Sequence, residues 1–290
     1  ILDCHQRIIV AFGGMPEDPE WLWVVDQVAE AMSEAREEGF RTGAFTADHA
    51  KHRRGDGFIP LAGGVSFGGG QVRPGNLVLP RRQRALFSKL LANKYVRRVC
   101  GFQSSIFSAF APKLFKDYVK DLRALFHHHP NLRHNFTNSI LPAVTFNLGP
   151  QSVTFEHADL LNRALGWCLL TSAGKYNPKK SGHLYLKQLK LVVEFPPAAT
   201  VCLPSAVINH GNTPLARGET RYSITQYAAG GLFRWVKYGF QTAKQLLAKK
   251  GGRALKAQLD GASGERHAAG LDLFSKFSDL ASDHAASFSK

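Results

Sequence analysis

The second half of this 290-residue chain changes its hydrophobic period, and that change limits the fold more than any other feature. Between residues 140 and 240, short apolar or alternating runs are separated by Gly, Pro and Asn. Alternation with a period of two is typical of strands that bury one face. The runs expected to be strands are 143–147, 153–157, 183–186, 190–195, 200–203 and 221–227. Many short strands of this kind predict a jelly roll or a barrel.

The first half follows a helical period instead. Apolar residues recur every three or four positions over 18–39, 81–94 and 112–126, which predicts three helices. Asp18 and Pro19 suit the start of the first helix, and Gly39 suits its end. From residue 241 the chain is rich in Lys, Ala, Gly and Ser. There we expect one helix over 241–249, a low-complexity stretch, and a weak helical pattern over 262–290.

The chain carries a large positive charge, with 37 Lys and Arg against 22 Asp and Glu, or a net +15. Such an excess raises the local concentration of polyanions. Nucleic acid is the expected partner, and an anionic membrane surface is the alternative. No apolar stretch reaches the roughly 18–20 residues that a membrane span needs, so we expect no membrane-embedded segment.

The four cysteines form no CxxC pair and no zinc-type spacing. Cys168 and Cys202 stand in apolar runs, which is expected of buried free thiols. This usage suits a reducing compartment, either the cytosol or the nucleus. No signal peptide is visible, and because the chain begins at Ile1 rather than Met, its natural N-terminus cannot be read here.

A His-x-Asp pattern, His157 and Asp159, ends one of the expected strands. Strand residues i and i+2 point to the same side, so both side chains can bind one ion. A third ligand must come from a distant strand, and His210 ends a later apolar run. Two His and one carboxylate form the facial triad of non-haem Fe(II) oxygenases. Alone the pattern is weak, because a chain with 12 His contains His-x-Asp by chance.

Arg221 strengthens the interpretation, because it begins an alternating run that places Ser223 and Tyr227 on the same face. A guanidinium binds a carboxylate through two parallel hydrogen bonds, which Lys cannot copy. We expect Arg221, helped by the Ser223 hydroxyl, to bind the far carboxylate of 2-oxoglutarate. A surface position for Arg221, or the same role for Arg217 in the preceding turn, is the alternative. Asn147 is a further candidate for contact with the cosubstrate or with a base edge.

The stretch from 143 to 242 resembles fungal TET/JBP-like dioxygenases. The segments that carry this resemblance are Thr145-Phe146-Asn147-Leu148-Gly149-Pro150, His157-Ala158-Asp159, Gly166-Trp167-Cys168, Gly182-His183-Leu184, Phe195-Pro196-Pro197, Pro204-Ser205-Ala206, His210 and Gln226-Tyr227-Ala228-Ala229-Gly230-Gly231-Leu232-Phe233-Arg234-Trp235. Arg53-Arg54-Gly55 and Val65-Ser66-Phe67-Gly68-Gly69-Gly70-Gln71 extend it to the N-terminal half. It covers about residues 1–243.

The resemblance implies an α+β fold with a double-stranded β-helix (jelly-roll) core and N-terminal helices packed against it. One domain would cover 1–243, with a helical and loop part over 1–135 and the β-helix over 136–243. Residues 244–290 would form a basic extension, helical or flexible. The resemblance also implies Fe(II) bound by His157, Asp159 and His210, with 2-oxoglutarate bound by Arg221.

The implied reaction is the oxidation, by O2, of a methyl group on a DNA base. We expect 5-methylcytosine, oxidised to 5-hydroxymethylcytosine and further forms, and a nuclear location follows from that substrate. N6-methyladenine demethylation is the first alternative. A 2-oxoglutarate hydroxylase of protein or small molecules is the second, and a nucleic-acid-binding module with a vestigial iron fold is the third. The sequence identifies no protein partner.

A base inside a duplex must be flipped out before its methyl group can reach a buried iron. The enzyme then needs cations for the phosphates and a pocket for the base. The phosphate candidates are Arg53, Arg54, Arg81, Arg82 and Arg84, and the base-pocket candidates are His183 and Tyr227. A solvated charged face is the alternative role for each arginine.

Overall fold

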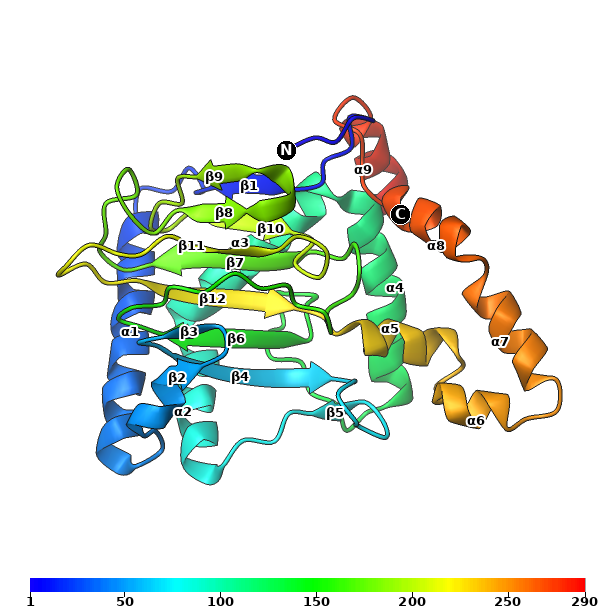
Figure 1. Cartoon of the computed structure of the whole chain (residues 1–290), viewed down its shortest axis with the longest axis horizontal. Helices are drawn as coiled ribbons and strands as arrows, with labels where there is room; N and C mark the ends of the chain where they lie inside the picture. The colour runs from blue at the N-terminus through cyan, green and yellow to red at the C-terminus, as the bar shows by residue number, and fades with distance from the viewer. Residues whose placement is uncertain (290) are drawn as a thin grey trace.

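Two antiparallel sheets face each other in the computed structural model, which describes residues 1–289 (Figure 1). The order of strands in the major sheet is β1 (Ala11–Gly14), β10 (Thr200–Leu203), β7 (Cys168–Ala173), β12 (Tyr222–Tyr227), β6 (Ala143–Leu148), β4 (Ile59–Ser66) and β5 (Gly75–Asn76). The minor sheet consists of β11 (His210–Asn212), β8 (Leu184–Leu186) and β9 (Leu191–Val193). A short hairpin, β2 (Lys51–His52) and β3 (Gly55–Asp56), lies beside them.

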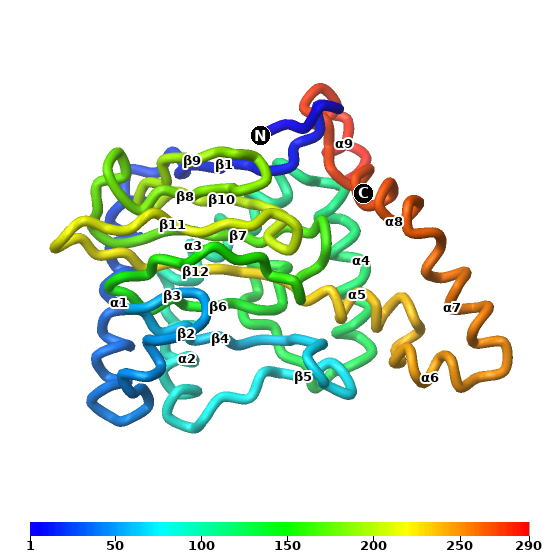
Figure 2. The backbone as a smooth tube through the Cα atoms, in the orientation of Figure 1, coloured from blue at the N-terminus to red at the C-terminus, as the bar shows by residue number. Residues whose placement is uncertain are grey.

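Helices cover the face of the major sheet that points away from the minor sheet (Figure 2). They are α1 (Trp21–Thr42), α2 (Arg81–Ala92), α3 (Lys94–Phe110) and α4 (Pro112–His128). Strand alternation explains this layering, since Leu61, Phe146 and Ile224 project into the core beneath the helices. A second core between the two sheets contains Val201 and Leu184 among its buried residues.

The first helix differs from its prediction at both ends. It begins at Trp21, and Asp18 precedes it, accepting a hydrogen bond from the backbone N–H of Glu20. Gly39 does not end it, because the helix continues to Thr42 and stops at Gly43, where φ is +70°. Gly39 is instead a packing position: a Cβ there would lie 2.0 Å from the Phe45 ring.

The strands at 143–147, 183–186, 190–195, 200–203 and 221–227 were predicted correctly to within two residues at each end. Residues 153–157 are not a regular strand: an isolated bridge between His157 and His210 and a backbone hydrogen bond from Asn212 to Thr154 join them to the minor sheet. Strand β4 occupies the start of the glycine-rich stretch, and β11 begins where a turn was expected. Helix α3 was not predicted.

The C-terminal part is helical through α5 (Gly230–Lys237), α6 (Ala243–Leu247), α7 (Gly252–Asp260), α8 (Ser263–Leu271) and α9 (Leu280–Phe288). Helix α7 lies where a low-complexity stretch was expected. The last segment returns to the body of the protein, because α9 packs on α4 and Phe274 is buried beside Trp167. Ile8 also donates a backbone hydrogen bond of 2.9 Å to Ser275. Among residues 1–289, no helix combines the length and the apolar character that crossing a membrane requires.

Candidate metal centre

The structure brings the three predicted metal ligands together. His157 and His210 exchange two backbone hydrogen bonds, of 3.0 and 2.9 Å, where the segment before Asp159 meets β11. The Asp159 backbone N–H donates to Ser205 at 2.8 Å, which holds the end of this segment. One ligand atom from each of the three side chains lies within 4.8 Å of the others. This is a donor set of two imidazoles and one carboxylate around one point.

Both imidazole rings are oriented by backbone carbonyls. His157 Nδ1 lies 2.8 Å from the carbonyl oxygen of Phe155, and His210 Nδ1 lies 2.8 Å from that of Ile208. We assign the proton to Nδ1 in each ring, because a carbonyl oxygen can only accept, and Nε2 is then left to bind a metal. Burial lowers the pKa of both rings, and for His157 the neighbouring His210 lowers it further. Neutral rings are the form that binds a metal ion.

Arg54 lies at this group rather than free on the surface. It stands in the turn of the β2–β3 hairpin, and its Nη2 is 2.6 Å from Asp159 Oδ1. The angles of this contact are not those of a hydrogen bond, so it is an ion pair only. Asp159 Oδ1 also lies 3.8 Å from His157 Nε2. In this structure Arg54 is thus a partner of the carboxylate ligand, and its contact with a phosphate stays a prediction.

Asn162 and Ser205 complete the surroundings of Asp159, and neither was predicted to take part. Asn162 Nδ2 lies 3.4 Å from Asp159 Oδ2 and 3.1 Å from Ser205 Oγ. The amide thus bridges the carboxylate and the segment that holds its backbone. The spacing Asp-x-x-Asn was the available signal, since a turn of that length returns the fourth side chain toward the first.

Arg221 is wholly buried, with 1% of its surface exposed. Its Nη1 donates a 2.5 Å hydrogen bond to the Ser152 carbonyl, and its guanidinium carbon lies 5.6 Å from the centre of the Phe195 ring. Its Nε and Nη2 are buried and have no hydrogen-bond partner among residues 1–289. Two parallel donors without an acceptor fit a carboxylate. Arg217, the alternative, is exposed in the turn before β12.

Polar side chains surround Arg221 on the inner face of the major sheet. Ser223 Oγ accepts a 2.9 Å hydrogen bond from Asn147 Nδ2 and lies 3.4 Å from Ser152 Oγ. Tyr227 lies further along the same face, with its hydroxyl 3.4 Å from Thr145 Oγ1. The structure therefore places Asn147, Ser223 and Tyr227 on one face with Arg221, as the alternation predicted.

His183 is not brought to this group. Leu184 and Leu186 of β8 project into the core between the sheets, so the residue before Leu184 points to the opposite, outer face. There the His183 ring pairs with the Thr213 hydroxyl at 3.0 Å. A place for His183 in a base pocket beside the metal centre is not supported by this position.

The other predicted DNA contacts are exposed but lie in two different places. Arg53 is exposed in the β2–β3 turn, next to Arg54. Arg81, Arg82 and Arg84 are exposed at the start of α2, in the helical layer. The metal group lies on the other side of the major sheet from this helical layer.

The protein resembles known proteins in structure, but no family model and no curated protein sequence matches it. A solved structure described as NgTET1 in complex with 5mC DNA matches with a TM-score of 0.52 and 14% identity, over 77% of this chain and 72% of that chain. A prolyl-4-hydroxylase from Pseudomonas putida matches with a TM-score of 0.38 and 14% identity, over 76% and 91%. AviO1 from Streptomyces viridochromogenes Tue57 has the same TM-score and identity, over 77% and 90%.

The likeness to NgTET1 confirms the predicted fold class, an α+β arrangement with a double-stranded β-helix core. At 14% identity it carries the fold and nothing further. The possible chemistry depends on the residues that this fold brings together.

Proposed function

We propose that the protein is an Fe(II)- and 2-oxoglutarate-dependent dioxygenase that oxidises a methyl group on a DNA base, with 5-methylcytosine as the first candidate. The observation that carries the proposal is the pairing of two features in one β-helix. One is the His157, Asp159 and His210 group, and the other is a buried Arg221 with two unpartnered donors. A metal and a dicarboxylate would satisfy both.

The residues present fit these two groups. The Nε2 atoms of His157 and His210 and a carboxylate oxygen of Asp159 would hold the iron. Arg221 would hold the far carboxylate of 2-oxoglutarate, with the Ser223 hydroxyl as a further donor. When bound, the iron and the 2-oxo acid supply the oxidising power that inserts oxygen into a methyl C–H bond.

The protein's own contribution is to hold these groups in fixed positions. Residues 152–157 connect the two sites, because Ser152 accepts the hydrogen bond from Arg221 and His157 is a ligand. Thr154, between them, donates a 3.0 Å hydrogen bond to Asn212, two residues after His210. The carbonyls of Phe155 and Ile208 fix the imidazoles, and Arg54 neutralises the carboxylate. Fixed geometry of this kind lowers the cost of reaching the reactive arrangement.

Substrate would reach the centre over the uncovered part of the major sheet. The minor sheet has three short strands, while the major sheet has seven. On the inner face of β6 and β4, Thr145 and Ala62 stay partly exposed. Phe155, two residues before His157, has 51% of its surface exposed. Apolar and hydroxyl groups beside the metal suit a flat base.

The choice of DNA rests on two supports. The net charge of +15 favours a polyanionic substrate. The fold is shared with NgTET1, a protein whose structure was determined with 5mC DNA. We therefore place the protein with TET-like base oxygenases rather than with hydroxylases of protein or small molecules, and in the nucleus.

Aerobic turnover on matched oligonucleotides tests this function. The oligonucleotides carry 5-methylcytosine, N6-methyladenine or thymine, and nucleoside mass spectrometry follows each base. An oxidised base that forms only with Fe(II) and 2-oxoglutarate, and not with Asp159→Ala, supports the proposal and identifies the base. Succinate release without base oxidation would instead assign the chain to the hydroxylases of other substrates.

A further inference from the structure

A tight turn directly after Asp159 exposes two leucines. The backbone N–H of Asn162 donates to the Asp159 carbonyl at 2.8 Å, which closes a four-residue turn. Leu160 and Leu161 occupy its two central positions, with 81% and 65% of their surfaces exposed. Gly, Pro, Asn, Asp and Ser dominate such positions, so two adjacent leucines at a turn tip are unusual. Asp159, the first residue of the turn, is one of the three metal-site residues.

The turn is anchored on both sides. Gly230 donates a backbone hydrogen bond of 2.9 Å to Leu161, and Arg163 donates one of 3.0 Å to Ala228. The Asn162 side chain is held by Ser205 on the other side. The exposed leucines are therefore presented on a fixed backbone rather than on a free loop. The Phe67–Gly68 segment lies alongside, since a Cβ at Gly68 would be 3.9 Å from a Leu161 methyl group.

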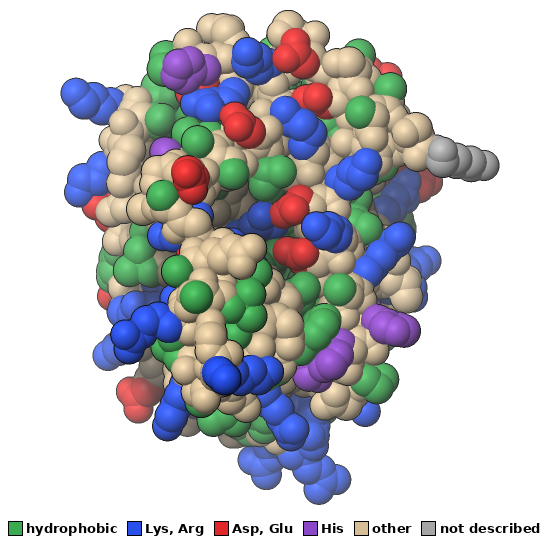
Figure 3. Space-filling view, turned by 90° about the vertical axis from the view of Figure 1, so that its right-hand side faces the viewer, with side chains coloured by type: hydrophobic (Ala, Val, Ile, Leu, Met, Phe, Trp, Pro, Cys, Tyr) green, Lys and Arg blue, Asp and Glu red, His purple; other side chains and the backbone are tan. Residues whose placement is uncertain are grey.

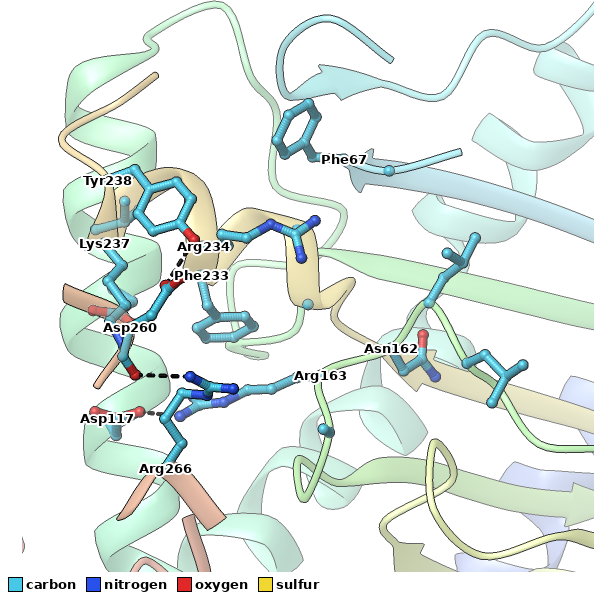
Figure 4. A pocket seen from close by; sticks show the side chains of 18 of the residues that line it. Phe67, Asp117, Asn162, Arg163, Phe233, Arg234, Lys237, Tyr238, Asp260 and Arg266 are labelled. Carbon is cyan, nitrogen blue, oxygen red and sulfur yellow. Dashed lines mark hydrogen bonds and ion pairs between the residues drawn. The ribbon is translucent and has the colours of Figure 1, made fainter. Parts of the chain in front are cut away.

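A cavity of about 980 Å³ opens beside this turn, and both leucines line it. Figure 3 shows mixed acidic and basic side chains around a hollow on this side of the molecule. Figure 4 shows Arg163 directed toward Asp117, with which it forms a 2.5 Å ion pair. None of His157, Asp159 and His210 lines the cavity, so it adjoins the metal centre through Asn162 rather than containing it.

The free charges of the cavity are mostly positive. Asp117 pairs with Arg163, and Asp260 pairs with Lys256 at 2.5 Å. The side chains of the lining that form no ion pair among residues 1–289 are Lys120, Arg234, Lys237, Arg266 and Asp121. Arg234 and Lys237 are exposed on α5, whose start is bonded to the leucine turn. An apolar tip beside free cations is complementary to a base stack beside its phosphates.

We propose that Leu160 and Leu161 form a wedge that enters the base stack of a DNA duplex and fills the gap left when the target base turns out toward the metal centre. Arg234 and Lys237 contact phosphates of the duplex beside that gap. The inference rests on the proposed function and deepens it, because it names the duplex as the substrate form that the turn serves. Turning a base out costs least in a single strand, so the wedge should matter chiefly for a duplex.

The test compares duplex and single-stranded oligonucleotides of the same sequence with one methylated base. The Leu160→Ala/Leu161→Ala variant should lose about 10- to 100-fold in kcat/KM on the duplex and change less than about 3-fold on the single strand. Leu160→Met/Leu161→Met keeps the apolar bulk and should retain most of the duplex activity. Val78→Ala, at a 91% exposed apolar residue that does not line the cavity, is the matched control and should change neither rate.

Equal losses on both substrates would overturn the wedge, because the turn would then act only by holding Asp159. Unchanged rates on both would overturn it as well. A wild-type protein that oxidises neither form would instead refute the proposed function, so the two failures are distinguishable.

The phosphate-binding role of α5 has a separate readout. Each cation that binds a phosphate steepens the slope of log binding constant against log salt concentration by just under one. Replacing both cations, in Arg234→Ala/Lys237→Ala, should therefore make the slope shallower by about one to two. An unchanged slope would overturn the phosphate role of α5.

Discussion

Replacing Arg221 with Met should stabilise the metal-free protein while abolishing its response to 2-oxoglutarate. The guanidinium is 1% exposed, and two of its nitrogens have no partner among residues 1–289. A buried donor left unsatisfied costs about 1–3 kcal/mol, so two cost about 4 kcal/mol at the middle of that range. The hydrogen bond to the Ser152 carbonyl stabilises the folded state by about 2 kcal/mol and so offsets half of that cost. Met, of similar length and apolar, should therefore raise the free energy of unfolding by about 2 kcal/mol.

With 2-oxoglutarate bound, the wild type should have a higher free energy of unfolding than Arg221→Met. A ligand that binds only the folded state at 100 times its Kd stabilises it by about 2.7 kcal/mol. Chemical denaturation without oxygen, with metal present and with or without 2-oxoglutarate, measures both effects. We expect the wild type to gain stability with 2-oxoglutarate and Arg221→Met to show no gain.

Arg217→Met is the matched control, because that arginine is exposed in the turn before β12. It should change neither the stability nor the response to the ligand. A strongly destabilised Arg221→Met protein, or one that 2-oxoglutarate stabilises as much as the wild type, would refute the assignment of Arg221 as the carboxylate clamp.

Three further predictions follow from other parts of the structure. His157→Ala should abolish base oxidation but change DNA affinity less than about 3-fold, since phosphate contacts dominate binding. Fluorescence anisotropy measures that affinity, and a large loss of it would contradict the prediction. Gln103 is wholly buried and accepts a 2.7 Å hydrogen bond from Gln226. Gln103→Leu should therefore lower the free energy of unfolding by about 3 kcal/mol. The control, Ser105→Ala at an exposed position of the same helix, should lower it by less than about 0.5 kcal/mol. A thiol reagent should label one cysteine, Cys4, in the folded protein and all four after unfolding. The other three are buried, and burial raises the pKa of each thiol. Rapid labelling of more than one cysteine in the folded protein would contradict this packing.

The sequence was most informative where a local rule applies. Alternation located β6, β10 and β12, because each buries one face against a core. The same rule placed Arg221 and Ser223 together, and the His-x-Asp spacing placed His157 beside Asp159. Joining these to His210 needed chemical knowledge of metal sites as well as periodicity.

Tertiary contacts decided the features that were missed. In helix α3 the apolar series Val96, Val99, Cys100, Ile106 and Phe107 is interrupted by the buried polar residues Gln103 and Ser104, and Gln103 finds its partners on distant strands. Gly39 suggested a helix end, while its real role is to make room for Phe45. Arg54 stands in a charged run typical of a surface, and only the position of the β2–β3 hairpin brings it to Asp159.

Anaerobic titration of Fe(II) into the protein, followed by calorimetry, tests the central claim most directly. The claim is that His157, Asp159 and His210 bind one iron ion. We expect one ion per chain in the wild type, and a loss of binding in Asp159→Ala and in His210→Ala. Arg217→Met should bind iron as the wild type does. No binding by the wild type, or undiminished binding by the two ligand variants, would contradict the assignment of this group as the metal centre.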